Sequence, residues 1–502
     1  MAAGDDLAVL PAAEIRRRVA AREVSPVEVV EAALARIDRL DPVLNAVVTR
    51  SPCALDDARR LERALAVGAE PGPLCGVPVG IKDVTPVAGL RHTYGSPLYG
   101  DHVAAVDALV VRRLRAAGAI VIGKTNTPEF AAGGHTFNDV FGPTRNPWDP
   151  RLSPGGSTGG GAAALATGMI ALAEGTDLGG SLRIPASFCG VVGLRPTAGL
   201  VPTWPSDYLW DELQVTGFLA RTAEDVAMAL QACAGPSELS PIGHGLGGRD
   251  LVAAVNAADA SGLRIAYCPD VAGIGVDPEI ESVCRRAAFA LRDAGATVEE
   301  IDLDLSWAWQ PYLALRGYWM VAQMHGRLDR LAQLGANVRT NTEAGLAADP
   351  ADLGAAEAAR NRVWESFREH FARFDHLLTP CMAVPPFPVE QNYPESIGGR
   401  AMKTYIDWIA PTFLLSLTGL PVAAVPAGLD PRGLPVGLQI VARPRSEAAA
   451  LALAGVVQDA NPVGLPERPH AVTARSVGTP GSGDSSRDRL GWVFEHVERE
   501  AP

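Results

Sequence analysis

The sequence predicts an α/β fold built on a parallel or mixed sheet, and two patterns in its second half support this. The segments LRIAYCPD and TVEEIDL have the composition of strands, and a helical pattern from Pro278 to Asp293 separates them. Further along, the apolar runs at 422–428 and 434–442 are typical of buried strands joined by a turn at 430–433. With 502 residues, 47% of them hydrophobic, the chain is long enough for one large core or two ordinary ones.

The amino-terminal third alternates helices and strands. The tetrapeptide SPVE that begins at Ser25 supplies an N-cap, a proline and a capping-box glutamate ahead of the helical run VVEAALARIDRL. The apolar segment GVPVGIKDV predicts a strand that ends at Lys82. We expect a helix from Asp107, as its N-cap, to Ala117, stopped by Gly118 and followed by the strand AIVIGKT.

Two glycine-rich loops follow in the middle of the chain. The sequence NPWDPRLSPGGSTGGG at 146–161 cannot hold regular structure, and it leads into an alanine-rich helix that ends near Gly168. The strand MIALAEGTD comes next, and then the second loop, LGGSLRIP, at 178–185. Because one helix and one strand separate the two loops, we expect them to meet at one edge of a sheet and to form a site there.

The charge and composition of the chain exclude several classes of partner. A formal net charge of −13 and a pI near 5.2 argue against electrostatic binding to nucleic acid or to an anionic membrane. No segment offers about 18 unbroken apolar residues, and the first residues lack the order of a signal peptide. Seven cysteines without CxxC pairs are typical of reduced thiols. We expect a cytoplasmic protein that acts on a small, uncharged or weakly charged substrate.

Lys82 is the first residue with unusual chemistry. A lysine side chain ordinarily has a pKa near ~10.4, and burial disfavours its charged form, so a buried lysine can accept a proton at neutral pH. The apolar segment GVPVG directly before Ile81 and Lys82 predicts such burial. Taken alone, the same lysine also fits an ordinary salt bridge with the neighbouring Asp83.

Two serines in the glycine loops are candidate partners for this lysine. Ser157 stands in PGGSTGGG, which lacks the Gly-Lys-Ser/Thr of a Walker loop and is not preceded by the strand that a dinucleotide-binding loop needs. Ser181 follows two glycines, so successive backbone N–H groups can curl around a developing oxyanion beside its hydroxyl. These N–H groups belong to Leu178, Gly179, Gly180 and Ser181. Read in isolation, each segment is also a common loop motif.

Longer motifs decide between these interpretations. The string GGSTGGGAAALATGMIALAEGTDLGGSLRIPASFCGVVGLRPTAGLVP resembles the signature segment of the amidase signature family. GVPVGIKD and GKTNTPEF resemble the two blocks that precede it in that family, and GLPVAAVPAG and GLPVGLQIVA resemble its C-terminal strands. The likeness covers roughly residues 5 to 460.

The resemblance implies a role for each candidate residue. Lys82 matches the family's base, Ser157 its bridging serine with a cis peptide bond before it, and Ser181 its nucleophile. The family's oxyanion hole falls on Leu178, Gly179, Gly180 and Ser181. Many members carry a second serine where this chain has Thr158, which keeps the hydroxyl.

The resemblance also implies the architecture. We expect an amidase signature fold in which a central mixed β-sheet of about eleven strands is covered by helices on both faces. A single domain is expected at 1–465, with the signature core at about 75–205. The remaining residues, 466–502, are rich in Ser, Gly and charge, and predict a disordered or loosely attached C-terminal tail.

The resemblance also implies which residues form one wall of the substrate pocket. The family's acyl side falls on Ala131, Ala132, Gly133 and Gly134, whose small size leaves a roomier and more flexible wall that favours bulky substrates. Six aromatic residues lie in segments that could form the pocket rim, although most aromatics in a chain of this size belong to the core. These are Trp204, Tyr208, Trp210, Trp319, Tyr405 and Trp408.

A histidine triad and a metal site are not supported by the sequence. It has no GxSxG elbow, and no Cys/His cluster has metal-ligand spacing, so we expect no metal and no cofactor. His135 lies nearest to the serine loops, and we interpret it as a loop or pocket residue rather than as a base. Asp177 and Arg183 flank the candidate nucleophile, and we expect them to brace its loop.

The sequence therefore predicts an amidohydrolase that uses Lys82, Ser157 and Ser181 on amide, carbamate (urethane) or ester bonds of a small molecule, as a monomer or homodimer. The alternative is the A subunit of a tRNA-dependent amidotransferase, which releases ammonia from glutamine inside a complex. Those subunits typically read RQP where this chain has Arg183-Ile184-Pro185, and they lack its TWPSDYLW segment. A non-catalytic binding protein is disfavoured because all three residues are present.

Overall fold

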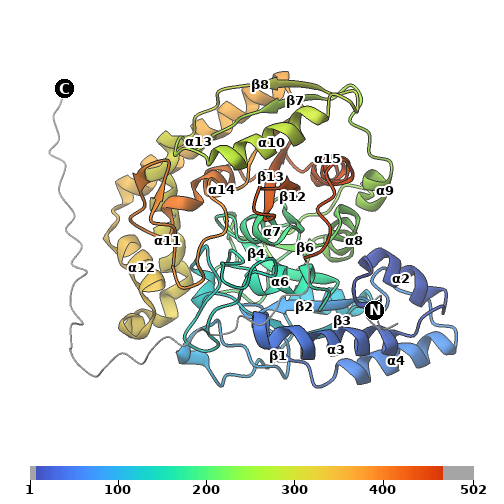
Figure 1. The fold of residues 1–502 in the computed structure, drawn as a ribbon. Helices are drawn as coiled ribbons and strands as arrows, with labels where there is room; N and C mark the ends of the chain where they lie inside the picture. Colours follow the sequence, from blue (N-terminus) through green and yellow to red (C-terminus); the bar gives the residue numbers. More distant parts are fainter. Residues whose placement is uncertain (1–6, 467–502) are drawn as a thin grey trace, which may run out of the picture. The chain divides into compact units, whose positions relative to one another are not determined.

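An 11-stranded mixed sheet runs through residues 7–466, the part of the chain that the computed structural model describes. Its strands lie in the order β1-β3-β2-β4-β6-β5-β12-β13-β9-β7-β8 (Figure 1). A separate two-stranded hairpin consists of β10 (Ser396–Ile397) and β11 (Arg400–Ala401). The strands of the main sheet are β1 (Val47–Arg50), β2 (Pro78–Lys82), β3 (Ile120–Thr125), β4 (Leu172–Asp177), β5 (Val192–Arg195), β6 (Val215–Ala220), β7 (Arg264–Tyr267), β8 (Thr297–Glu300), β9 (His376–Pro380), β12 (Val422–Leu429) and β13 (Pro435–Ala442).

Alternating side chains in the sheet point into two different cores. In β12, for example, Val422 and Ala424 belong to one cluster of buried residues, and Ala423 and Val425 belong to the other. This is the period of two that a strand covered on both faces requires. Helices that contribute to the first core are α3 (Pro26–Leu44), α4 (Ala54–Ala66), α6 (Gly159–Ala166), α7 (Arg183–Cys189), α11 (Trp309–Met324), α12 (Ala336–Ala347), α13 (Pro350–Arg373) and α14 (Ala410–Ser416). Those that contribute to the second are α2 (Ala12–Ala20), α5 (Leu109–Ala116), α8 (Ala223–Cys233), α9 (Leu251–Asn256), α10 (Pro278–Ala290) and α15 (Glu447–Ala460), together with Val29 of α3 and Leu65 of α4.

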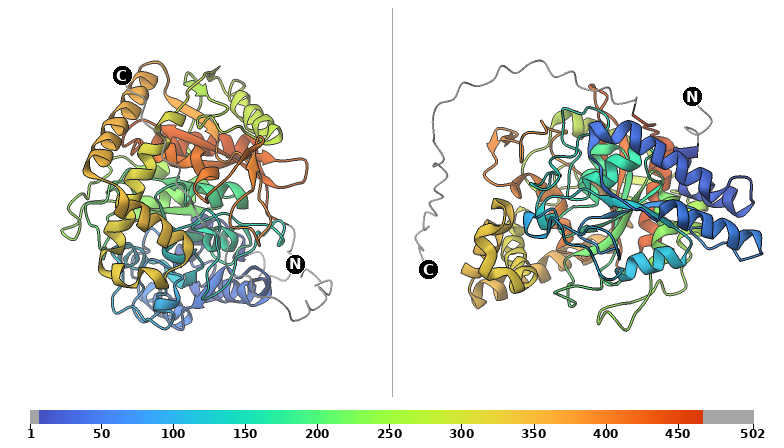
Figure 2. Two further views of the ribbon diagram at one scale, coloured as in Figure 1. Left: turned by 90° about the vertical axis from the view of Figure 1, so that its left-hand side faces the viewer. Right: turned by 90° about the horizontal axis from the view of Figure 1, so that it is seen from below.

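The predicted fold class is confirmed, down to about eleven strands with helices on both faces. Strands β7 and β8 are parallel and α10 lies between them in the chain, as the β-α-β pattern predicts. Strands β12 and β13 form the expected antiparallel pair. Helices α11 to α13 stand apart from the amino-terminal helices α3 and α4 in Figure 1 and in the right-hand view of Figure 2.

The parallel arrangement around β2 positions the site. Strand β2 lies between β3 and β4 and is parallel to both, with Ile81 paired to Glu174 of β4. The carboxyl ends of these strands therefore open at the same edge of the sheet. Lys82 is the last residue of β2 and Asp177 is the last of β4, so the segments that follow them start side by side.

Of three predictions made from sequence signals at helix ends, two are confirmed and one is wrong. The Ser25 hydroxyl accepts from Val27 N–H at 3.0 Å and the Glu28 carboxylate accepts from Ser25 N–H at 2.8 Å, which completes the capping box. Helix α6 ends at Ala166, close to the predicted end. Asp107 is not an N-cap, because its carboxylate accepts from the backbone N–H of Ala88 at 2.8 Å and α5 begins two residues later.

The second glycine loop is shorter than predicted, because α7 begins inside it at Arg183. The Asp177 carboxylate accepts hydrogen bonds from Gly180 N–H at 2.9 Å and Leu182 N–H at 3.1 Å, and an acid at this place satisfies N–H groups at a helix start. Among residues 7–466, no helix is long and apolar enough to cross a membrane. The predicted C-terminal tail, apart from Pro466, lies outside the described residues.

Candidate active site

Lys82 lies at the end of β2 with its side chain fully buried. Its side-chain nitrogen Nζ is 2.7 Å from Ser157 Oγ and 3.0 Å from Thr176 Oγ1. The alternative interpretation, a salt bridge between Lys82 and Asp83, is wrong, because Asp83 pairs with the equally buried Lys124 at 2.9 Å. Lys82 is therefore left to contact two hydroxyl groups.

Burial lowers the pKa of Lys82 to about 7, although the negative charges of Glu174 and Asp177 oppose this shift. Glu174 lies directly behind the lysine in β4. Its carboxylate accepts from the backbone N–H of Lys82 at 3.1 Å and from the Thr85 hydroxyl at 2.9 Å, and burial raises its own pKa to about 7. The sequence analysis missed Glu174, although a carboxylate inside the apolar strand MIALAEGTD is the signal that could have found it.

Ser157 is fully buried in the first glycine loop, and the peptide bond that joins it to Gly156 is cis. The next residue, Thr158, donates its backbone N–H to the carbonyl of Ser181 at 3.2 Å, which holds the two serine loops together. Within the described part of the chain, the Ser157 and Ser181 side chains make no direct hydrogen bond to each other. The structure thus brings Lys82 against Ser157 and brings Ser181 to the same loop through its backbone.

An ion-pair network fixes the turn that carries Ser181. Arg183 Nη2 lies 2.9 Å from Asp177 Oδ1, and both side chains are completely buried. Burial alone would raise the pKa of Asp177, but the charges of Arg183 and Arg195 hold it below its usual range. Arg183 also donates to the carbonyl of Thr412 at 2.8 Å. The expectation that Asp177 and Arg183 brace the loop that carries Ser181 is confirmed.

The predicted oxyanion hole has three free donors rather than four. The N–H of Gly180 already donates to Asp177, whereas those of Leu178, Gly179 and Ser181 donate to no residue between 7 and 466. The same three residues line a pocket, and Gly180 does not. The turn therefore presents three backbone donors to the space beside the Ser181 hydroxyl.

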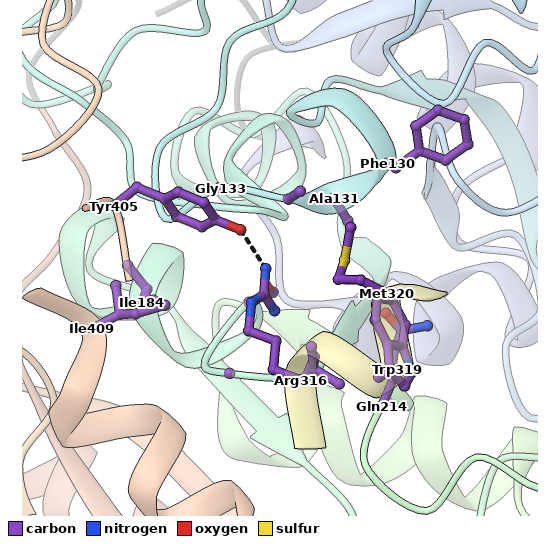
Figure 3. Close-up of a pocket in the computed structure, with 14 residues that line it drawn as sticks. Phe130, Ala131, Gly133, Ile184, Gln214, Arg316, Trp319, Met320, Tyr405 and Ile409 are labelled. Carbon is purple, nitrogen blue, oxygen red and sulfur yellow. Dashed lines mark hydrogen bonds between the residues drawn. The ribbon is translucent and has the colours of Figure 1, made fainter. Parts of the chain in front are cut away.

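That pocket encloses about 410 Å³, part of it open to solvent (Figure 3). Ala131, Ala132 and Gly133, three of the four residues considered for the substrate pocket, line it. Gly134 does not line the pocket, because a Cβ at this position would lie 2.6 Å from Cζ2 of Trp408, against which the backbone packs. The remaining lining residues are Phe130, Leu178, Gly179, Ser181, Ile184, Gln214, Arg316, Trp319, Met320, Tyr405 and Ile409.

The sequence profile of the family described as "Amidase" matches residues 28–451, a span that contains Lys82, Ser157 and Ser181. The chain belongs to the amidase signature family.

Relatives of this amidase cover nearly its whole length. It is 37% identical over 461 residues to an acylamidase of Rhodococcus erythropolis, with 90% of this chain and 96% of the relative covered. It is 36% identical to the A subunit of the glutamyl-tRNA(Gln) amidotransferase of Methylococcus capsulatus, with 89% and 96% covered. The crystal structure of a bacterial aryl acylamidase superposes with a TM-score of 0.84 at 29% identity, covering 90% of this chain and 96% of the other.

The aromatic residues considered from the sequence are divided between the pocket and the core of the amidase. Trp319 and Tyr405 line the pocket. Trp408 is fully buried and stacks on Phe188, with ring centroids 5.9 Å apart. The other three lie elsewhere: Tyr208 lines a second pocket, the Trp204 ring lies beneath Arg112, and Trp210 is exposed.

His135 supports a loop of the amidase and lies outside the pocket. Its Nε2 is 2.9 Å from the carbonyl of Val389, and its Nδ1 accepts from Thr136 N–H at 2.8 Å and lies 2.6 Å from Ser153 Oγ. Burial lowers the pKa of His135 to about 4, so the ring is neutral at pH 7. Within the described residues, no group of three or more His, Cys, Asp or Glu side chains is arranged to hold a metal ion.

The close packing of the Ser181 turn leads to a prediction for Gly180→Ala. Gly180 has φ +124°, and a Cβ there would lie 2.3 Å from Thr412 Oγ1. We expect the variant to lose about 2–4 kcal/mol of unfolding free energy and most of its amidase turnover. Denaturant unfolding and initial rates measure the two effects.

Gly399→Ala is the matched control for this substitution. Gly399 also has a positive φ of +83°, but nothing lies within 4 Å of its added Cβ and it does not line the pocket. We expect it to cost about 1 kcal/mol and to leave turnover unchanged. Equal behaviour of the two variants would contradict the view that the Ser181 turn is tightly packed.

Proposed function

We propose that this amidase hydrolyses amide-type C–N bonds of aryl acylamides, other amides or carbamates, and also esters, through an acyl-enzyme on Ser181. The observation that carries the proposal is the buried Lys82, whose Nζ lies 2.7 Å from Ser157 Oγ. A lysine whose pKa is lowered by burial to about 7 is largely neutral in mild alkali, and a neutral amine can act as a base.

Proton transfer proceeds in two directions. Neutral Lys82 takes a proton from Ser157 while Ser157 takes one from Ser181, and the Ser181 oxygen forms a bond to the substrate carbonyl carbon. The Ser181 hydroxyl donates to Ser157 once substrate is bound, since catalytic hydrogen bonds often form only in that complex. When the C–N bond breaks, the proton returns by the same path to the departing amine, and water then hydrolyses the acyl-enzyme.

The free backbone donors of the turn stabilise the charge that develops. In the tetrahedral intermediate the carbonyl oxygen carries a negative charge, which hydrogen bonds from fixed N–H groups lower in energy. Leu178, Gly179 and Ser181 supply such groups in the pocket beside the nucleophile. Each lost donor of this kind typically costs about 10²–10³ in turnover.

The substrate class is proposed from both the relatives and the pocket. The relatives named acylamidase and aryl acylamidase favour acyl amides, and Trp319 supplies an aromatic surface in the pocket. The small wall at Ala131, Ala132 and Gly133 favours bulky groups there. Cytoplasmic location, a monomeric or dimeric state and the absence of a cofactor stay predictions from the sequence.

The A subunit of a tRNA-dependent amidotransferase is the second candidate, because such subunits are nearly as similar to this chain. The Arg183-Ile184-Pro185 sequence and the segment at 203–210 favour the independent hydrolase. The two candidate functions predict different activities for the purified chain without partner subunits. A hydrolase turns over small amides alone, whereas glutaminase activity that needs added partner subunits would support the second candidate.

A substrate panel with covalent labelling tests the proposed function. We expect the purified chain to hydrolyse anilides, aryl esters and aryl carbamates, and an aryl sulfonyl fluoride to inactivate it by sulfonylating Ser181. Peptide mass mapping locates the label, and Ser206, which lies in the second pocket, serves as the internal comparison. Label on another residue, or turnover of none of the three substrate types, would contradict the proposal.

A further inference from the structure

Arg316 is a buried cation in the pocket beside Ser181. It comes from α11, only 6% of its surface is exposed, and its guanidinium points into the space that Figure 3 shows. Its Nε donates to Asn341 Oδ1 of α12 at 3.1 Å, and its Nη2 donates to the hydroxyl oxygen of Tyr405. Neither partner is a carboxylate.

No carboxylate neutralises this cation. Within the described chain, no Asp or Glu oxygen lies within the 4.0 Å of an ion pair with Arg316, although the structure contains many such pairs elsewhere. The nearby acids have their own partners: Asp211 accepts from Trp319 Nε1 at 2.6 Å, and Asp177 pairs with Arg183. An unpaired charge is expensive to bury, so a cation that faces a pocket indicates an anion that arrives with the ligand.

Tyr405 adds a second donor to the same place. Its hydroxyl oxygen accepts from Arg316, so its own O–H proton remains available to another acceptor. The guanidinium fork and this hydroxyl together match the two oxygens of a carboxylate. The apolar side chains of Ile184, Met320 and Trp319 line the same pocket and suit a short hydrocarbon segment between that carboxylate and the scissile bond.

We propose that Arg316, oriented by Tyr405, selects amide substrates that carry a carboxylate group, which binds in the same pocket as the scissile carbonyl. The proposal rests on the proposed function of Ser181. It also narrows the expectation of an uncharged or weakly charged substrate to a monoanionic one. The carboxylate can belong to the acyl group or to the departing aromatic amine, and matched substrates distinguish these sources.

Two pairs of isosteric anilides test the proposal. For the acyl side, the p-nitroanilide of succinic acid is compared with that of 4-methylpentanoic acid, in which an isopropyl group replaces the carboxylate. For the amine side, 4-acetamidobenzoate is compared with 4-isopropylacetanilide. We expect the wild type to prefer the anionic member of one pair by about tenfold or more in kcat/KM, because a site built for a polar group disfavours its apolar isostere.

Arg316→Met is the decisive variant, because it keeps a long side chain and removes the charge. We expect kcat/KM for the preferred anionic substrate to fall about 100-fold, largely through KM, while its neutral isostere changes by less than about threefold. Tyr405→Phe should reduce the same preference by a smaller factor. Arg327→Met is the matched control, since Arg327 also contacts a tyrosine, Tyr99, but lies outside the pocket.

The results of these experiments distinguish a failure of this proposal from a failure of the proposed function. If the wild type cleaves the neutral anilides at least as fast as their anionic partners in both pairs, the proposal is overturned, whether or not Arg316→Met folds. If Ser181→Ala abolishes turnover of those neutral anilides, the proposed function still holds. If Arg316→Met lowers both members of a pair equally, Arg316 has a general structural role and the selection of a carboxylate is also overturned.

Discussion

We expect Ser181→Ala to lower kcat on amide substrates by at least about 10⁴-fold, because the variant loses the only atom that can form the acyl-enzyme while the three N–H donors around it remain. The fold should survive, since the Ser181 side chain makes no hydrogen bond within residues 7–466. Initial rates on an anilide, together with a thermal melt of each protein, measure the effect.

Ser187→Ala is the control for this first prediction. Ser187 lies in α7, six residues from Ser181, and its hydroxyl accepts from the backbone N–H of Gly437 at 3.0 Å. Its loss should lower stability by about 1 kcal/mol and leave kcat nearly unchanged. If Ser181→Ala retained most of its turnover, another nucleophile would have to be sought and the proposed mechanism abandoned.

The second large effect concerns Lys82 and pH. Burial lowers the pKa of Lys82 to about 7, and only the neutral amine accepts a proton, so activity on amides should be poor in mild acid, rise through about pH 7 and then level off. Lys82→Met should reduce amide turnover by about 10³-fold and abolish this rise. Profiles of kcat/KM against pH for both proteins make the comparison.

Two comparisons identify the titrating group. An activated aryl ester needs no proton on its leaving group, so Lys82→Met should cost less on the ester than on the anilide. Glu174→Gln removes a negative charge that favours protonated Lys82, so the rise should move to lower pH. A profile that stays in place in Glu174→Gln, or that persists in Lys82→Met, would assign the titration to another group.

The residues of the candidate site could be singled out because their signals are local in sequence. Ser157 and Ser181 stand in one uninterrupted glycine-rich string, and Lys82 ends a strand whose apolar character is plain. The strands β12 and β13 were equally predictable, since a buried central strand reads as a continuous apolar run. These features depend on neighbours within a few residues.

The features that sequence reasoning missed depend on tertiary contacts. Asp83 pairs with Lys124, 41 residues away, rather than with the adjacent lysine. Arg316 meets Tyr405 across 89 residues, and no periodicity in either segment indicates that they share a pocket. Gly134 resembles its three small neighbours in composition, but Trp408, brought against it by the fold, turns it away from the pocket.

The two sides of the pocket come from separate parts of the chain. Lys82 ends strand β2 and Ser181 follows β4, whereas Arg316, Trp319 and Met320 lie on α11, in the helical group that stands apart from the amino-terminal helices (Figure 1). Substrate choice and bond chemistry can therefore diverge independently during evolution. A protein engineer can randomise the pocket face of α11 to obtain new specificities, since none of those positions holds the proposed nucleophile or the proposed base.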